Sequence, residues 1–185
     1  MTKEIFKFYL DPRCWPMLCV FVLLRIFCCL PYAWMMGIGQ FLGLFAYYVI
    51  PSRTKIIKKN LSLSFPKLNN QEILKLTKLT WMSHGMGVIE SGLAWWGDEK
   101  FLRKIVRVEG KEFLVQEDNP TQSLMILSAH FTTLDLCGRC MSMFRKFSVT
   151  ARRQSNKCFD YFITKFRSSY YQSLLFSRDI KQVYK

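Results

Sequence analysis

The sequence predicts an α/β fold preceded by an apolar N-terminal segment, and three observations point to it. Residues 124–127 are four consecutive apolar residues, the pattern of a short strand buried on both faces. Segments of helical periodicity lie on both sides of that run. Residues 17–50 contain one charged residue, Arg25, and have the composition of a membrane segment. With 185 residues, half of them hydrophobic, the chain can fill the core of one ordinary domain.

Residues 1–52 form the expected membrane-anchoring segment. The uncharged run 26–52 is longer than the roughly 20 residues that a helix needs to span a bilayer. Pro31 and the glycines between residues 37 and 43 could bend such a helix. A span, a re-entrant hairpin and a deep interfacial helix are therefore all compatible with the sequence. A secretory signal peptide is not expected, because the apolar region is too long and no small-residue cleavage site follows it.

The net charge of +14, from 27 Lys and Arg against 13 Asp and Glu, indicates an anionic partner. Basic residues flank the apolar segment on both sides, and the cluster after it is denser. The positive-inside rule places that cluster, and everything after it, on the cytoplasmic side of the membrane. A solvated basic linker without lipid contact is the alternative. Nucleic acid is not an expected partner, because no binding signature is present and the apolar N-terminus would hinder such a role. The flanking cations are Lys3, Lys7 and Arg13 before the segment, and Arg53, Lys55, Lys58 and Lys59 after it.

The seven cysteines are read as reduced thiols, since four of them lie in or beside the apolar segment. Cys137 and Cys140 have the spacing of a thiol oxidoreductase site. They come several residues into a predicted helix, however, so the helix N-terminus assists them little, and a zinc site would need a second pair. No motif requires a metal or an organic cofactor.

The remaining elements alternate between helix and strand. Asn69 and Glu72 form a capping box that opens a helix reaching about residue 95. His84 lies on that helix among apolar residues, which indicates packing. Turn residues separate the elements that follow, and we expect a mixed or parallel sheet flanked by helices. These elements are a strand at 105–108, a helix at 111–117, a turn at 119–120, strands at 124–128 and 147–151, an amphipathic helix from Asn156, and a further strand starting at 182–184.

His130 closes the central apolar run and has a carboxylate, Asp135, five positions on. Residues five apart in a helix point about 140° away from each other, so the two cannot pair if both lie mid-helix. They can pair if His130 lies in the loop and Asp135 in the first turn, with Thr132 or Thr133 as N-cap. A histidine oriented by a carboxylate acts as a general base. The alternative is a satisfied histidine beside a helix-capping Asp.

The strand at 147–151 delivers Arg152 and Arg153 to its carboxyl end. That is the edge where His130 lies if the strands are parallel. Arginine presents a planar fork that fits phosphate or carboxylate, so the pair could clamp a lipid head group or the phosphopantetheine of a carrier. The alternative is a pair of surface arginines, which we favour for Arg153.

Three runs in the chain carry a resemblance to a known family. Together they resemble the late acyltransferases of lipid A biosynthesis, the lauroyl and myristoyl transferases of the lysophospholipid acyltransferase superfamily. Members of that family have an N-terminal membrane helix and a His-x4-Asp/Glu motif. The resemblance covers nearly the whole chain, in the right order. The runs are Asn60-Leu-Ser-Leu-Ser-Phe-Pro66, Gly85-Met-Gly-Val-Ile-Glu-Ser-Gly-Leu-Ala-Trp-Trp96, and His130-Phe-Thr-Thr-Leu-Asp135 with Leu136 and Gly138-Arg139 behind it.

The resemblance implies transfer of a fatty acyl chain from an acyl carrier protein thioester to a hydroxyl of a phosphorylated glucosamine disaccharide lipid. The reaction would take place at the cytoplasmic face of the inner membrane. His130 would be the general base and Asp135 would orient it. The resemblance also implies substrate binding by the residues that match other family letters, namely Arg139, Arg152, Asn156, Asp160 and Arg167.

Two departures from the family pattern keep alternatives open. The motif ends in Asp135 where Glu is more usual, and Ala151 and Arg153 replace the Tyr and Pro that flank the family arginine. Because Asp is usual in the wider superfamily, a glycerolipid or lysophospholipid acyltransferase is the first alternative, and a membrane-bound relic without turnover is the second. Relatives of this type continue well beyond this length. Residues 53–185 are therefore expected to be the N-terminal part of a glycerolipid-acyltransferase-like domain whose sheet is incomplete at the C-terminus.

Overall fold

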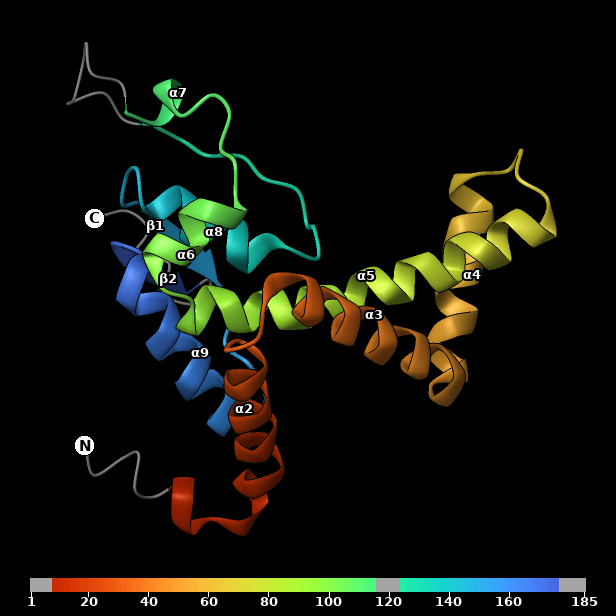
Figure 1. Cartoon of the computed structure of the whole chain (residues 1–185), viewed down its shortest axis with the longest axis horizontal. Coiled ribbons are helices and arrows are strands. Elements are labelled where there is room, and N and C mark those ends of the chain that lie inside the picture. The colour runs from red at the N-terminus through yellow and green to blue at the C-terminus, as the bar shows by residue number, and fades with distance from the viewer. Residues whose placement is uncertain (1–7, 116–123, 177–185) are drawn as a thin grey trace.

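The computed structural model describes residues 8–115 and 124–176, and this part of the chain is mostly helical (Figure 1). Two short strands form a parallel sheet. The elements in chain order are η1 (Pro12–Cys14), α2 (Trp15–Phe27), α3 (Tyr32–Val49), α4 (Pro51–Ser64), α5 (Asn70–Trp96), α6 (Glu99–Ile105), α7 (Glu112–Val115), α8 (Leu134–Ser142), β1 (Ser148–Ala151), α9 (Lys157–Tyr170) and β2 (Ser173–Phe176).

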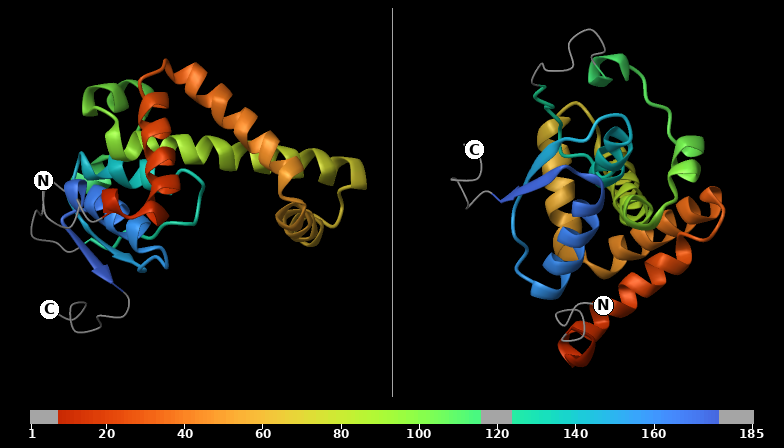
Figure 2. Two further views of the ribbon diagram at one scale, coloured as in Figure 1. Left: turned by 90° about the horizontal axis from the view of Figure 1, so that it is seen from below. Right: turned by 90° about the vertical axis from the view of Figure 1, so that its left-hand side faces the viewer.

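The long helix α5 is the axis of the molecule. The predicted capping box opens it: the Asn69 side chain accepts hydrogen bonds from the backbone N–H groups of Gln71 and Glu72, and the Glu72 carboxylate accepts one from Asn69 N–H at 2.8 Å. The helix α4 lies at one end of α5, and α6 and α8 gather at the other end (Figure 1, Figure 2).

Helix α3 runs along α5, and glycines on both helices form the contact. A side chain at Gly85 would collide with the backbone of Gly39 and Gly43, and a side chain at Gly43 would collide with the backbone of Trp81. The glycines therefore allow two backbones to approach closely. Of the residues predicted to bend the segment, Pro31 lies at a break between two helices, whereas the glycines do not bend α3, which is continuous from Tyr32 to Val49.

The expectation of one N-terminal membrane helix is also corrected. Residues 17–50 form two helices, α2 and α3, and the break at residues 28–31 includes Pro31, which cannot continue a helix because it lacks the N–H. In residues 8–115 and 124–176 no single helix is both long enough and apolar enough to cross a membrane. Helices α3 and α4 reach that length and composition only as a pair, bent by 100°.

The sheet agrees with the sequence at one strand only. The predicted strand at 147–151 is β1, which pairs in parallel with β2 in a register that runs from Ser148 opposite Ser173 to Ala151 opposite Phe176. The predicted amphipathic helix between them is α9, and the Asn156 side chain caps it. Strand β2 was not predicted. The strand expected from residue 182 lies outside the described residues.

Two predicted strands are wrong. Residues 106–108 follow the end of α6 without regular structure, and residues 124–130 are likewise irregular. The side chains of Met125 and Leu127 are 92% and 96% exposed, so the central apolar run is not buried. A strand buried on both faces needs neighbours on each side, and no described strand pairs with this run. The helix expected at 111–117 is present as α7, while residues 116–117 and the turn at 119–120 lie outside the described part.

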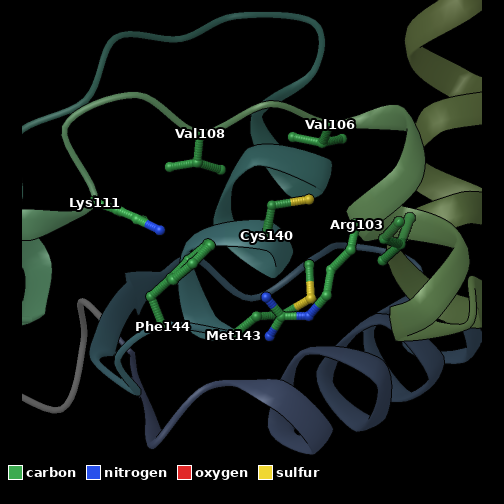
Figure 3. Close-up of a pocket in the computed structure, with 8 residues that line it drawn as sticks. Arg103, Val106, Val108, Lys111, Cys140, Met143 and Phe144 are labelled. Carbon is green, nitrogen blue, oxygen red and sulfur yellow. The ribbon is translucent and has the colours of Figure 1, made fainter.

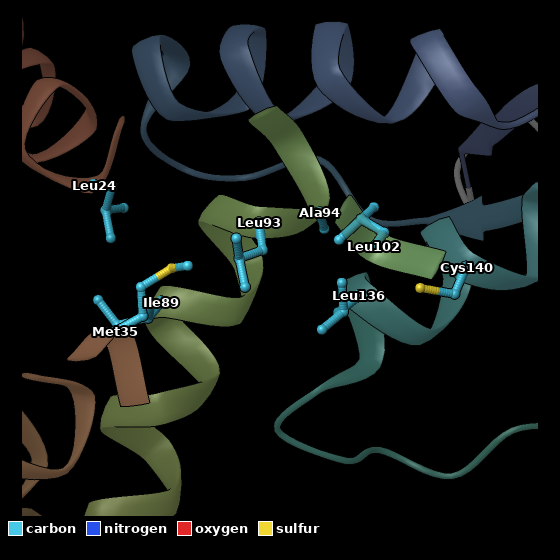
Figure 4. Packing of buried hydrophobic residues seen from close by; sticks show 8 residues of the cluster. All are labelled: Leu24, Met35, Ile89, Leu93, Ala94, Leu102, Leu136 and Cys140. Carbon is cyan, nitrogen blue, oxygen red and sulfur yellow. The ribbon is translucent and has the colours of Figure 1, made fainter. Parts of the chain in front are cut away.

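The hydrophobic core joins the helices before residue 115 to helix α8, which follows residue 124. Its buried side chains come from α2, α3, α5, α6 and α8 (Figure 4). A second, aromatic cluster around Phe21 connects α2, α5 and α9. Since α8 and α9 both pack on α5 or its neighbours, the residues that they carry are held in fixed relative positions. The core residues are Leu24, Met35, Ile89, Leu93, Ala94, Leu102, Leu136 and Cys140.

Candidate active site

His130 and Asp135 occupy the positions that their spacing predicts. His130 lies in the irregular segment before α8 and is exposed, and Asp135 lies in the first turn of α8 behind the N-cap Thr133. The Thr133 hydroxyl makes no capping hydrogen bond and lies 3.5 Å from the Sγ of Cys137. Within the described residues, the imidazole makes no hydrogen bond with the carboxylate. The structure confirms the loop and first-turn placement, and the pairing of the two stays a prediction.

The Asp135 carboxylate is instead held by Arg167 from the last turn of α9. The Nε and Nη2 atoms of Arg167 donate to Oδ1 of Asp135 at 3.0 and 2.7 Å. The two side chains are 23% and 17% exposed, so water screens the ion pair only in part. Both donors converge on one oxygen, so among residues 8–115 and 124–176 Oδ2 of Asp135 keeps its lone pairs for another donor. Sequence reasoning assigned Arg167 to substrate and missed this pair, since no local signal indicates a contact across 32 residues.

Two tyrosines at the end of α9 line the ion pair. Tyr170 and Tyr171 are both buried, and the Arg139 guanidinium lies over the Tyr170 ring at 5.3 Å from its centroid. A side chain at Gly138 would collide with the Tyr171 hydroxyl, so glycine lets that hydroxyl approach α8. Burial raises the pKa of Tyr171 to about 12, and the negative charge of Asp135 acts in the same direction. Both phenols are therefore neutral beside the carboxylate at physiological pH.

The glycine-rich run of α5 connects the histidine loop to the helix core. A side chain at Gly87 would come within 2.8 Å of the Thr132 carbonyl oxygen, and Gly85, one half-turn earlier, faces α3. The run Gly85-Met-Gly87 therefore packs against α3 on one side and against the loop between His130 and α8 on the other. No local pattern in the sequence predicted this contact.

Arg152 follows β1 and is exposed, as expected for a residue at the carboxyl end of that strand. In the part of the chain that the structure describes, its guanidinium makes no hydrogen bond or ion pair. Arg153 differs: it donates to Asp160 at 3.2 Å, and its guanidinium lies 3.6 Å from the centroid of the Phe176 ring. This contact agrees with the interpretation of Arg153 as a structural surface arginine.

Asn156 and Asp160, the other predicted substrate ligands, have local partners. The Asn156 side chain accepts a hydrogen bond from Phe159 N–H at 3.0 Å and so caps α9. The Asp160 carboxylate accepts one from Gln154 N–H at 2.7 Å, besides its bond with Arg153. These contacts fix the turn between β1 and α9. Substrate binding by either residue stays a prediction.

A small cavity of about 210 Å³ lies between α6, residues 106–111 and α8. Figure 3 shows the side chains of Arg103 and Lys111 on its two sides, with Cys140 between them. Arg103 is bound by Glu99 at 2.7 Å. Burial raises the pKa of the Cys140 thiol to about 11, the opposite of the shift that a reactive thiol needs. Cys140, the buried member of the pair with Cys137, is therefore not an activated thiol.

His84 lies on the exposed side of α5, and its Nδ1 is 2.7 Å from the Thr80 carbonyl oxygen. Since a carbonyl can only accept, Nδ1 carries the proton and donates it. The ring also lies 6.1 Å from that of Trp81. The contact with Trp81 agrees with the predicted packing, although the His84 side chain itself is exposed.

A histidine on a loop, followed by a first-turn carboxylate, matches a hydroxyl-activating site only if the two side chains pair. The family to which this chain belongs is the one described as bacterial lipid A biosynthesis acyltransferase, whose model matches residues 3–185.

Individual relatives agree with this family. The chain is 30% identical over 159 residues to the lipid A biosynthesis palmitoleoyltransferase of Escherichia coli (strain K12). The aligned residues are 86% of this chain and 52% of that protein. The chain is 29% identical over 176 residues to the lipid A biosynthesis lauroyltransferase of the same organism, covering 95% and 58%. A Haemophilus influenzae lipid A biosynthesis acyltransferase is 27% identical over 179 residues, covering 96% and 57%. The chain thus spans little more than half the length of these relatives. The comparison with solved structures gave no match.

Proposed function

We propose that this chain carries the catalytic residues of an acyltransferase that moves a fatty acyl chain from an acyl carrier protein thioester to a hydroxyl of a lipid A precursor. The observation that supports it most directly is the Asp135 carboxylate, which Arg167 fixes through one oxygen in the turn next to the loop with His130. The names of the relatives, a palmitoleoyltransferase and a lauroyltransferase of lipid A biosynthesis, support the reaction class.

His130 is the general base of the proposed reaction. Its imidazole takes the proton of the acceptor hydroxyl as the hydroxyl oxygen attacks the thioester carbonyl carbon. The new C–O bond forms, the C–S bond breaks, and the leaving thiolate takes the proton back from the imidazolium. Asp135 orients the ring and stabilises its charged form through Oδ2. The His130 side chain must turn toward α8 for this contact to form.

Arg167 is a positioning residue in this account. Its two hydrogen bonds to Oδ1 stop the carboxylate from rotating and present Oδ2 in a fixed direction. Because the carboxylate is already held rigid, less conformational entropy is lost when the imidazole binds to it. This role differs from the substrate binding that the family letters imply for Arg167.

Arg152 is the best candidate for anion binding among the described site residues. Its guanidinium is exposed and unpaired in that part of the chain, so it is available to the phosphate of the donor's phosphopantetheine arm or of the acceptor. Arg139, Asn156 and Asp160 are proposed to line the same substrate region while they keep their structural contacts.

The proposed location is the cytoplasmic side of the inner membrane. The exposed surfaces of α2 and α3 include many large apolar side chains, and α4 adds cations directly after them. A membrane location suits a substrate that is itself a lipid.

A radiolabelled acyl transfer assay tests the proposal. Acyl carrier protein thioester is the donor, and lipid A precursor and lysophosphatidic acid are rival acceptors. Because the chain spans about half of its relatives, the assay uses the 185-residue chain and the same chain extended by the C-terminal half of a relative. Label in the lipid A precursor supports the proposal. Label only in lysophosphatidic acid indicates the glycerolipid alternative, which the Asp of the motif favours, and no label from folded protein indicates a relic.

A further inference from the structure

Helix α3 presents an uninterrupted apolar stripe to the outside of the molecule. The side chains of Trp34, Phe41, Phe45 and Tyr48 are 68%, 68%, 58% and 65% exposed. They follow each other at helical spacing on the face opposite Met35, Gly39 and Gly43, which are buried. An apolar patch of this extent on a folded surface marks an interaction site.

The same helix is fixed to the folded unit. Its glycines touch the backbone of α5, and α5 continues into the core through Ile89 and Leu93. If α3 crossed a bilayer, the core that its Met35 shares with Ile89 of α5 and Leu136 of α8 would have to enter the bilayer with it. The stripe can reach lipid without drawing the folded core into the bilayer only from the surface.

Helix α4 supplies charge beside the stripe. It turns away from α3 by 100° after Val49, and it carries four exposed cations. In residues 8–115 and 124–176 none of them forms an ion pair with a carboxylate. Apolar and aromatic side chains on one element and unpaired lysines on the next are the composition of a segment that lies in a membrane interface. The cations are Arg53, Lys55, Lys58 and Lys59.

We infer that this chain binds the bilayer as a monotopic protein: the stripe of α3 enters the boundary between head groups and acyl chains, and α4 lies along the head groups with its cations on anionic phosphates. The inference deepens the membrane part of the proposed function. The occupant is a lipid surface and not an acidic protein, because the apolar stripe adjoins the cations. Both ends of the described chain then lie on one side of the membrane.

Vesicle co-sedimentation tests the two parts of this surface. The full chain is mixed with vesicles of phosphatidylcholine alone and with vesicles in which a third of the lipid is phosphatidylglycerol. Each interfacial lysine contributes about fivefold to the affinity, so reversal of Lys55, Lys58 and Lys59 to Glu should weaken binding to the anionic vesicles by at least a hundredfold. Lys100 and Lys104 lie on α6 and Lys111 directly precedes α7; Figure 1 shows these helices at the opposite end of the molecule from α4. Reversal of these three lysines changes the net charge equally and should weaken the binding much less. Equal losses in both variants would overturn the inference.

The stripe variant Phe41→Gln with Phe45→Gln should lose binding to both kinds of vesicle while its circular dichroism stays unchanged, since both rings are exposed. Retained binding would exclude the stripe as the lipid contact. If the α4 triple variant binds vesicles normally but loses binding to acyl carrier protein, the surface is a protein interface and the inference is wrong.

Sidedness decides between monotopic and spanning attachment. Tags at the two ends of the chain, probed with protease in sealed membrane vesicles, should be cleaved or protected together. Protection of one tag and cleavage of the other would show a span and contradict the inference. None of these measurements depends on acyl transfer, so the inference and the proposed reaction can fail separately.

Discussion

Replacement of Arg167 by methionine tests how Asp135 is held. The ion pair is mostly buried. Loss of an exposed ion pair lowers the free energy of unfolding by at most about 1 kcal/mol, and loss of one partner of a fully buried pair lowers it by about 3 to 5 kcal/mol, so the value for this pair should lie between the two. We expect a loss of about 2 kcal/mol, which lowers the Tm of a chain of this size by about 4 to 8 °C. Thermal unfolding in detergent measures it.

A double-mutant cycle isolates the pair. Asp135→Asn should cost about as much as Arg167→Met, and the double variant should cost clearly less than their sum, with a coupling of at least about 1 kcal/mol. Single costs that add to within about 0.5 kcal/mol would refute the reasoning, because the two side chains would then act independently.

Kinetics separates the two roles considered for Arg167. If Arg167 positions the catalytic carboxylate, Arg167→Met lowers kcat by about tenfold or more and leaves KM nearly unchanged. If it binds substrate, KM rises while kcat changes little. The second pattern would return Arg167 to the substrate-binding role that the family letters imply.

Four further predictions follow from the structure. His130→Ala should abolish acyl transfer without a change in Tm, because the side chain is exposed, while His84→Ala is mild; the reverse order in the transfer assay would show that the site is misassigned. Burial raises the pKa of Glu90, whose Oε2 has no hydrogen-bond partner in the described chain. Because the pKa of Glu90 is raised in the folded state, the carboxylate destabilises the fold at pH values above the ordinary glutamate pKa of about 4, and not below it. Glu90→Gln should therefore raise Tm more at pH 7 than at pH 4. Equal increases in Tm at the two pH values would contradict this. Gly85→Leu should prevent α3 from packing on α5 and lower Tm strongly, and an unchanged Tm would rule out the close helix contact. The chain should sediment with membranes in high salt and be released by detergent, because salt screens the charges but does not weaken the burial of apolar side chains. Release by salt alone would contradict this prediction.

The sequence predicted the elements whose signals are local. The capping box at Asn69 and Glu72 opens α5, and Asn156 caps α9, because in each case the donor and the acceptor lie within three residues. His130 and Asp135 were placed correctly for the same reason: a loop followed by the first turn of a helix is a short-range pattern.

The errors concern features that depend on distant neighbours. The run at 124–127 has strand composition, but an apolar run becomes a strand only where another strand pairs with it, and β1 pairs with β2 instead. The glycines of α3 look like a bend until α5 is placed against them. Likewise, the pair between Asp135 and Arg167 exists because α8 and α9 meet in the folded molecule, and nothing in either helix alone indicates it.

The central claim is that His130 activates the acceptor hydroxyl. The most direct measurement is the transfer of radiolabelled acyl chains from acyl carrier protein to lipid A precursor by the protein and by His130→Ala, each extended by the C-terminal half of a relative and each shown by circular dichroism to be folded. We expect label in the lipid from the parent protein and none above background from His130→Ala. Undiminished labelling by His130→Ala would contradict it.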